Sequence, residues 1–155
     1  MKILIALDAS NHSERALEFL TRMRWPAGSR VIVLSVIHPP VDPSSTDPRT
    51  TMATGELLEE QRRRLEELVA SAECTLREAG FPAEGRILDG DPREALADVA
   101  RTERADLLVV GSRGRTGITK LVLGSVSSHL VTHAPCSVLV VKHDGAEGAR
   151  KGGSS

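Results

Sequence analysis

Residues 106–117 read Asp106-Leu107-Leu108-Val109-Val110-Gly111-Ser112-Arg113-Gly114-Arg115-Thr116-Gly117, and this stretch decides the fold. Its apolar run lacks polar alternation, which is typical of a parallel strand covered by helices on both faces. The glycines that follow permit positive φ and let backbone N–H groups approach a ligand closely. Farther on, a segment of helical period begins at Gly124-Ser125-Val126. The free N–H groups and the positive dipole end of this helix would point at an anion bound by the turn. The stretch therefore predicts a strand, an anion-binding turn and a helix.

Four further strands are predicted from short runs rich in Val, Ile and Leu. They are Lys2–Asp8, Arg30–Ile37, Glu84–Asp89 and Ser137–Lys142. Segments of helical period lie between the strands, and this alternation is typical of βαβ units. We therefore predict one doubly wound α/β domain with a five-stranded parallel sheet. Such a sheet binds ligands beyond the carboxyl ends of its strands.

The predicted helices carry start and stop signals. Asn11 and Glu14 form a capping pair for the first helix, and Asp91-Pro92 supplies a cap and a first-turn proline for the third. The second helix has a clear apolar face and is predicted to end at Gly80. The fourth covers about residues 124–133.

Length and composition limit the class of protein. The chain has 155 residues and a formal net charge of −1, which fits one domain and gives no reason to expect a nucleic-acid partner. No apolar stretch reaches the roughly 20 residues of a membrane span, and residues 1–8 are too short for a secretory leader, so we expect a cytoplasmic protein without a membrane partner. The domain is expected to cover residues 1–143, with a disordered Gly- and Ser-rich tail at 144–155. Residues 38–54 hold four prolines and are predicted to be a loop.

The turn after the fourth predicted strand has the chemistry of a phosphate-binding loop. Arg113, Arg115 and Lys120 add positive charge, which suits a triphosphate better than a neutral ligand. The loop lacks the lysine and hydroxyl pair of a Walker A sequence and the glycine spacing of dinucleotide-binding folds, so neither a P-loop NTPase nor a Rossmann dehydrogenase is supported. The alternative is that the glycines only form turns between strand and helix.

The spacing Gly111-x2-Gly114-x9-Gly124-Ser125 resembles the nucleotide motif of the universal stress protein family, in its ATP-binding branch. Residues 1–16, the turn Gly90-Asp91-Pro92 and the run 135–141 also resemble that family. The resemblance covers residues 1–143 apart from 39–54. It implies an adenine nucleotide alpha hydrolase-like fold with strand order 3-2-1-4-5.

The resemblance also implies roles for individual residues. Ala6 and Asp8 would contact the adenosine or metal side of the pocket, Val36 the adenine, and Val110 and Gly111 the ribose. Some family members have proline in place of Ala6 and methionine in place of Val110. Together with Arg113, chosen for its charge, the candidate nucleotide-binding residues are Ala6, Asp8, Val36, Val110, Gly111, Arg113, Gly114, Gly124, Ser125 and Val126. The expected cofactor is ATP with Mg²⁺, for which Asp8 is the possible metal ligand.

Simpler interpretations remain open for several polar residues. Asp8 is also suited to capping the first helix, and Ser125 to capping the fourth. His12 fits a partly exposed helical histidine, and His38 fits either a pocket rim or an ordinary loop position. His129 and His133 are four residues apart, a spacing that can bind metal, but no glutamate of a zinc-protease motif accompanies them.

Three functions follow from these observations. The leading hypothesis is an ATP-binding stress-response or signalling module. The alternatives are a slow ATPase, although no convincing catalytic base is present, and a nucleotide-independent interaction protein. The fifth predicted strand is apolar and would lie at a sheet edge, so we expect a homodimer formed through residues 138–141.

Overall fold

The computed structural model describes residues 1–39, 47–113 and 123–143, without the side chains of residues 50 and 51. Gly114, Arg115, Lys120 and the tail 144–155 therefore lie outside the described residues. Strands and helices alternate along the chain. They are β1 (Lys2–Ala6), α1 (Asn11–Arg22), β2 (Arg30–Ile37), α2 (Pro48–Glu78), β3 (Ala83–Asp89), α3 (Pro92–Thr102), β4 (Leu107–Gly111), α4 (Ser125–His133) and β5 (Ser137–Val141).

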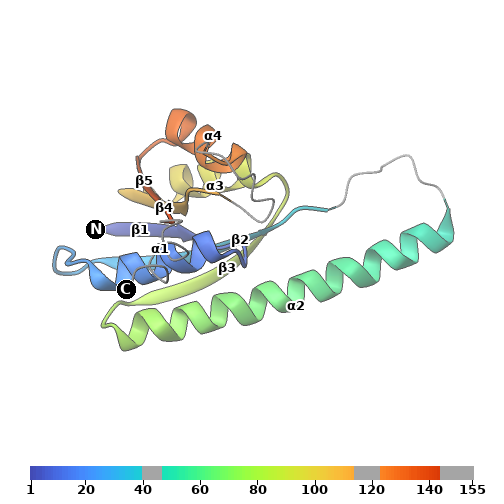
Figure 1. Ribbon diagram of the computed structural model, residues 1–155, viewed down its shortest axis with the longest axis horizontal. Helices are drawn as coiled ribbons and strands as arrows, with labels where there is room; N and C mark the ends of the chain where they lie inside the picture. The colour runs from blue at the N-terminus through green and yellow to red at the C-terminus, as the bar shows by residue number, and fades with distance from the viewer. Residues whose placement is uncertain (40–46, 114–122, 144–155) are drawn as a thin grey trace, which may run out of the picture.

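The strands form one parallel sheet, as the sequence predicted, in the order β3-β2-β1-β4-β5 that the resemblance implied. Alternate side chains of β1 point to opposite faces, which gives the sheet two separate apolar layers. Ile3 and Ile5 pack with residues of α1 and α2, whereas Leu4 packs with residues of α3 and α4. The molecule therefore has three layers, with two helices on each face of the sheet (Figure 1).

The start of α1 differs from the predicted cap. Ser10, not Asn11, is the N-cap, and its side-chain oxygen accepts a hydrogen bond from the backbone N–H of Ser13 at 3.2 Å. Asp8 in turn accepts a hydrogen bond from the backbone N–H of Ser10 at 3.0 Å. Asp8 thus holds Ser10 in the cap position. The spacing of Asn11 and Glu14 in the sequence gives no sign of this contact.

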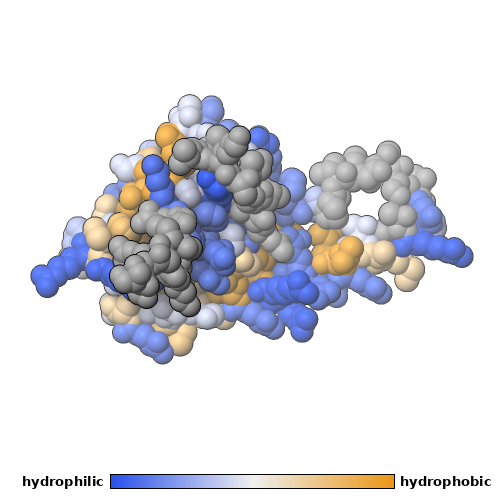
Figure 2. Space-filling model, in the orientation of Figure 1, coloured by the Kyte–Doolittle hydropathy of each residue, from blue (hydrophilic) through white to orange (hydrophobic). Residues whose placement is uncertain are grey.

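The predicted loop at 38–54 is wrong in its second part, because α2 begins at Pro48. Asp47 caps this helix by accepting a hydrogen bond from the backbone N–H of Arg49 at 2.9 Å. The same Asp-Pro signal was recognised at Asp91-Pro92, where it begins α3 as predicted. The first turns of α2 project beyond the sheet (Figure 1), and apolar residues are visible on this projecting part (Figure 2).

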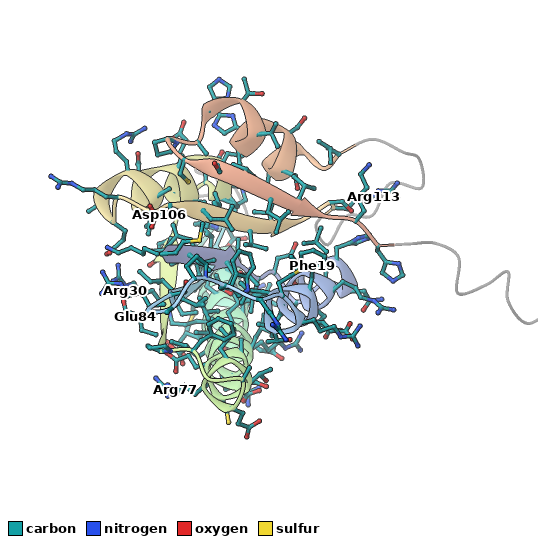
Figure 3. All side chains as sticks on the ribbon, turned by 90° about the vertical axis from the view of Figure 1, so that its left-hand side faces the viewer. Phe19, Arg30, Arg77, Glu84, Asp106 and Arg113 are labelled. Atoms are coloured by element: carbon teal, nitrogen blue, oxygen red, sulfur yellow. The ribbon has the colours of Figure 1, made fainter. Side chains whose placement is uncertain are left out.

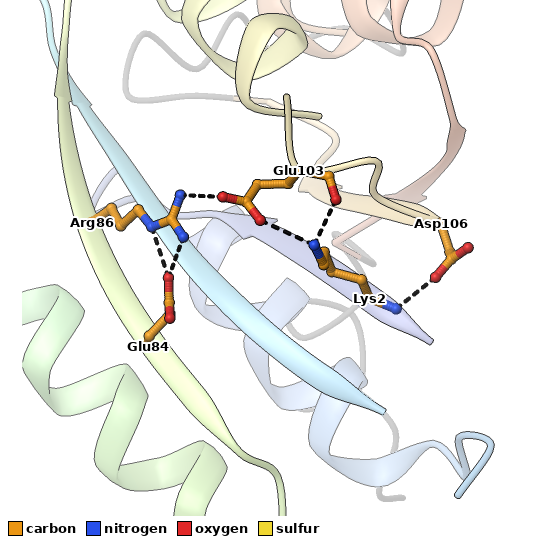
Figure 4. A network of polar contacts seen from close by, with 5 residues as sticks. All are labelled: Lys2, Glu84, Arg86, Glu103 and Asp106. Atoms are coloured by element: carbon orange, nitrogen blue, oxygen red, sulfur yellow. Dashed lines mark hydrogen bonds and ion pairs between the residues drawn. The ribbon is translucent and has the colours of Figure 1, made fainter. Parts of the chain in front are cut away.

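A polar network joins the amino ends of two strands to the end of α3 (Figure 4). The Glu103 carboxylate accepts hydrogen bonds from Lys2 Nζ at 3.1 Å and from Arg86 Nη1 at 2.6 Å. Arg86 also pairs with Glu84, and the backbone N–H of Lys2 donates to Asp106. These donors, Arg86 first and Lys2 second, lower the pKa of Glu103 below its ordinary value of 4.5.

Gly85 on β3 allows α2 to pack closely against the sheet. A Cβ atom at Gly85 would lie 2.0 Å from Val69 Cγ1 and 2.9 Å from Glu73 Oε1. We therefore predict that Gly85→Ala lowers the free energy of unfolding by about 1–3 kcal/mol, because overpacking must displace the helix. Urea denaturation measures the change.

Gly55 in α2 provides the matched control, because a Cβ atom there has no neighbour within 4 Å. Gly55→Ala should raise the free energy of unfolding by about 0.5–1 kcal/mol, since alanine favours a helix interior. Equal effects of the two substitutions would contradict the close packing inferred at Gly85.

Acid should weaken the Glu103 network. The pKa of Glu103 is lowered in the folded protein, so its stabilising effect is present above pH 4.5 and is lost as pH falls through the lowered folded value. We predict that Glu103→Gln loses less unfolding free energy than the native protein between pH 7 and pH 3. Urea denaturation at both pH values tests this, with Glu60→Gln, from an exposed pair with Arg64, as the control. The idea fails if Glu103→Gln keeps the native pH dependence.

Candidate functional site

The site lies at the carboxyl ends of the central strands, where β1 separates β2 from β4. A cavity of about 110 Å³ opens there between the strand ends, α3 and α4. Its walls are mainly apolar, and Asp8 and Arg113 are the charged residues among those described. The lining residues are Ala6, Leu7, Asp8, Ser13, Leu34, Val36, Pro92, Leu96, Val110, Gly111, Arg113, Val126 and Ser127.

A second hollow of about 320 Å³ adjoins this cavity and extends it toward α2. Asp8, Val36 and Val126 line both spaces, so the two form one cleft. The second hollow adds a residue that follows β2, two residues of α2 and two residues at the start of α4. These residues are His38, Gln61, Leu65, Gly124 and Ser125.

The cleft brings together the described members of the predicted set. The residues on the inner cavity are Ala6, Asp8, Val36, Val110, Gly111, Arg113 and Val126, and those on the adjoining hollow are Gly124 and Ser125. Gly114 lies outside the described residues. The sequence analysis missed Leu34, Pro92, Leu96 and Ser127. Pro92 belongs to the turn Gly90-Asp91-Pro92, which resembles the family. That resemblance was the sequence signal that could have placed Pro92 at the site.

Asp8 precedes the N-terminus of α1, and hydrogen bonds to neighbouring serines hold it in place. Its Oδ1 atom accepts hydrogen bonds from the backbone N–H and the hydroxyl of Ser10, at 3.0 Å and 2.5 Å. Its own backbone N–H donates to Ser13 Oγ at 3.3 Å. Asp8 therefore orients the cap of α1 without being the cap itself, and its carboxylate stays on the cavity wall.

Backbone hydrogen bonds hold the two ends of the β4–α4 connection together. The backbone N–H of Gly124 donates to the carbonyl of Ser112 at 2.8 Å, and Ser127 Oγ donates to the carbonyl of Gly111 at 2.7 Å. Gly124 occupies the N-cap position, so the interpretation of Ser125 as the cap is wrong. Within the part of the chain that the structure describes, no side-chain hydrogen bond caps the first turn of α4. This turn can therefore present backbone N–H donors to an anion in the cleft.

Gly111 and Gly124 do not use the positive φ that glycine permits. Gly111 is absent from the positive-φ glycines, and Gly124 has φ −58°. A Cβ atom on Gly111 would lie 2.7 Å from the carbonyl carbon of His12. The close approach of α1 therefore requires glycine at the end of β4.

His38 lines the adjoining hollow, whereas His12 is not among the residues that line the cleft. His12 Nδ1 is 3.4 Å from Ser112 Oγ, and its ring centroid is 5.5 Å from that of His143. Burial lowers the pKa of His12, and the nearby His143 and Arg113 lower it further against the opposite effect of Asp8. The ring of His38 contacts the carbonyl of Gly90 at 3.1 Å and lines the hollow, which fits a rim position.

The ends of β4 and β5 bring Arg113 to the edge of the cleft. Gly111 pairs with Val141, so the two strands finish side by side, and Figure 3 shows Arg113 just past the end of β4. The cleft thus combines an apolar slot, a carboxylate, a guanidinium and a helix start.

Within the described ranges, no three His, Cys, Asp or Glu side chains are grouped closely enough to hold a metal ion. None of the described helices has the length and apolarity to cross a membrane.

The sequence model of the universal stress protein family matches residues 1–142. The universal stress protein Sll1388 of Synechocystis is 34% identical over 92% of this chain and 97% of its own length. A universal stress protein of Thermus aquaticus is also 34% identical, over 90% of this chain and 97% of its own length.

Solved structures share the fold. The hypothetical protein MJ0577 superposes with a TM-score of 0.82 at 26% identity, over 93% of this chain and 96% of that chain. An Arabidopsis thaliana family protein with AMP bound gives a TM-score of 0.62 at 23% identity, over 95% and 94% of the two chains. An Archaeoglobus fulgidus family protein in complex with dAMP gives 0.65 at 22% identity, over 92% and 98%. Sequence and structure agree that the chain belongs to the universal stress protein family.

Proposed function

We propose that this protein binds an adenine nucleotide, with ATP as the preferred ligand, and acts as a cytoplasmic, nucleotide-dependent stress-response module. The observation that carries the proposal is one cleft that combines an apolar cavity, a carboxylate, a guanidinium and a helix start with glycine at the N-cap. Ligand sites are mainly apolar with a few converging polar groups, and the adjoining hollow of about 320 Å³ falls in their usual range of roughly 300–1,000 Å³. Two proteins of the same fold hold AMP and dAMP.

Each part of the nucleotide has a suitable partner in the cleft. Leu34, Val36 and Leu96 give an apolar wall for the flat base. The Asp8 carboxylate accepts hydrogen bonds and suits the ribose hydroxyls. Arg113 and the backbone N–H groups at the start of α4 suit the phosphates.

Magnesium fits beside Asp8, because Mg²⁺ bound to nucleotides commonly takes one or two carboxylates and otherwise phosphate and water oxygens. The ion would neutralise part of the triphosphate charge. Asp8 would hold it, and Ser10 would fix the orientation of the carboxylate through its two hydrogen bonds. Binding, rather than turnover, is the activity that we assign to the cleft.

Filling the cavity should abolish nucleotide binding. We predict that Val126→Trp weakens ATP and AMP binding at least tenfold, because the larger side chain occupies the space of the base and ribose. Val131→Trp is the matched control, since Val131 lies on the same helix but is 53% exposed and does not line the cleft. Isothermal titration of nucleotide-free protein measures both affinities, and circular dichroism checks the fold.

The control variant should bind as the native protein does. Native protein that is free of nucleotide and shows no affinity for ATP up to about 1 mM would overturn the proposed function. Equal affinities of the two tryptophan variants would instead place the nucleotide outside this cleft.

The assembly proposed for this function is a homodimer through β5. This strand forms one edge of the sheet, and its Val138, Leu139 and Val140 are only partly buried. Phe19 of α1, a helix that contacts β5, is 38% exposed. An apolar strand with unpaired backbone groups favours pairing with a second copy. The contact would be isologous, because each copy presents the same edge.

Sedimentation tests the dimer. The native protein should sediment as a dimer at tens of micromolar, and Leu139→Arg should be monomeric because it adds a charge to the edge strand. Leu139 also packs against the core, so circular dichroism checks that the variant is folded. Met52→Arg provides the control, since Met52 is 73% exposed on the projecting part of α2. A monomeric native protein would refute the proposed interface, as would a Leu139→Arg variant that remains dimeric.

A further inference from the structure

The last turn of α4 carries two histidines that the nucleotide cleft does not use. His129 and His133 are four residues apart and therefore share one face of the helix. Their rings are stacked, with centroids 4.2 Å apart and planes inclined by 18°. His133 is exposed and His129 is half-buried, so the pair is accessible from solvent.

The backbone fixes the tautomer of one ring. His133 Nδ1 lies 3.0 Å from the carbonyl oxygen of His129. A carbonyl oxygen only accepts hydrogen bonds, so Nδ1 must carry the proton. The Nε2 atom of the neutral ring then keeps its lone pair. Metal-binding histidines commonly have this arrangement, with one ring nitrogen bound to a carbonyl and the other available to the ion.

The distance between the rings suits a shared ion. Zinc binds histidine nitrogens at about 2.0–2.1 Å, so two nitrogens on a tetrahedral ion are about 3.3 Å apart. In rings that are nearly parallel with centroids 4.2 Å apart, the lone pairs run side by side, so the ring of His129 must turn about its side-chain torsions for both nitrogens to point at one ion. The same spacing of two histidines on one helix face supplies two ligands in helical zinc motifs.

The electrostatic surroundings also favour a cation. The carbonyl end of a helix carries partial negative charge, and the pair occupies the final turn of α4. The other close histidine pair in the described part of the chain, His12 and His143, has rings inclined by 62° and lies near Arg113. A guanidinium repels a metal ion, so that pair is the poorer candidate.

We propose that His129 and His133 form a two-histidine chelate for a divalent transition metal ion such as Zn²⁺, Ni²⁺ or Cu²⁺. Imidazole ligands suit these ions. No third His, Cys, Asp or Glu side chain joins the pair among the residues that the structure describes. Water therefore completes the coordination shell, and the ion exchanges with solvent. This site is separate from the nucleotide cleft and does not depend on the proposed function.

Metal titration of the chelator-treated full chain tests the proposal. Native protein should bind one equivalent of Zn²⁺, and His129→Ala and His133→Ala should each weaken binding at least tenfold. The double variant should bind no more weakly than either single variant, because a chelate is lost with its first ligand. His12→Ala is the control and should keep the native affinity.

Electron paramagnetic resonance of the Cu²⁺ complex of the native protein provides an independent readout. It applies even if a variant fails to fold. The native protein should show two coordinated imidazole nitrogens. A spectrum with one imidazole would overturn the proposal, as would native Zn²⁺ affinity in either single variant or loss of binding in His12→Ala.

Discussion

The position of β1 at the centre of a parallel sheet is the constraint from which the rest of the structure follows. β1 pairs with β2 on one side and with β4 on the other, and its Ile3, Leu4 and Ile5 are completely buried. The chain therefore leaves β1 through α1 on one face and reaches β4 through α3 on the other. Two connections that diverge to opposite faces leave a crevice between the strand ends. The cleft with Asp8 and Gly111 lies in this crevice.

Close packing beside the crevice then determines which residues can surround it. The backbone of His12 comes so near to Gly111 that no side chain fits there. Ser127, in turn, uses its hydroxyl to bond the Gly111 carbonyl, which ties α4 to the end of β4. Position 111 is thus constrained by α1 on one side and by α4 on the other. The motif glycine at this position is therefore required by packing.

Much of this architecture could be predicted from the sequence, and the failures have physical causes. Continuous Val, Ile and Leu runs located all five strands, but the first was extended to Asp8 although pairing with β2 ends at Ala6. The start of α2 was missed because residues 48–57 project beyond the sheet and so have little apolar periodicity. The strand order came from the family resemblance rather than from periodicity. Leu34 and Leu96 were missed because periodicity identifies buried residues without saying which of them border a cavity.

The helix α4 connects the two features that sequence patterns had only suggested. Its first turn begins after the glycine N-cap and borders the cleft, whereas its last turn carries the stacked histidines. A helix of nine residues is too short to be stable by itself, so it depends on tertiary packing, to which the fully buried Leu130 contributes. An anion at its start and a cation at its end both oppose the helix dipole. Each ligand would therefore interact favourably with the same short helix, at opposite ends.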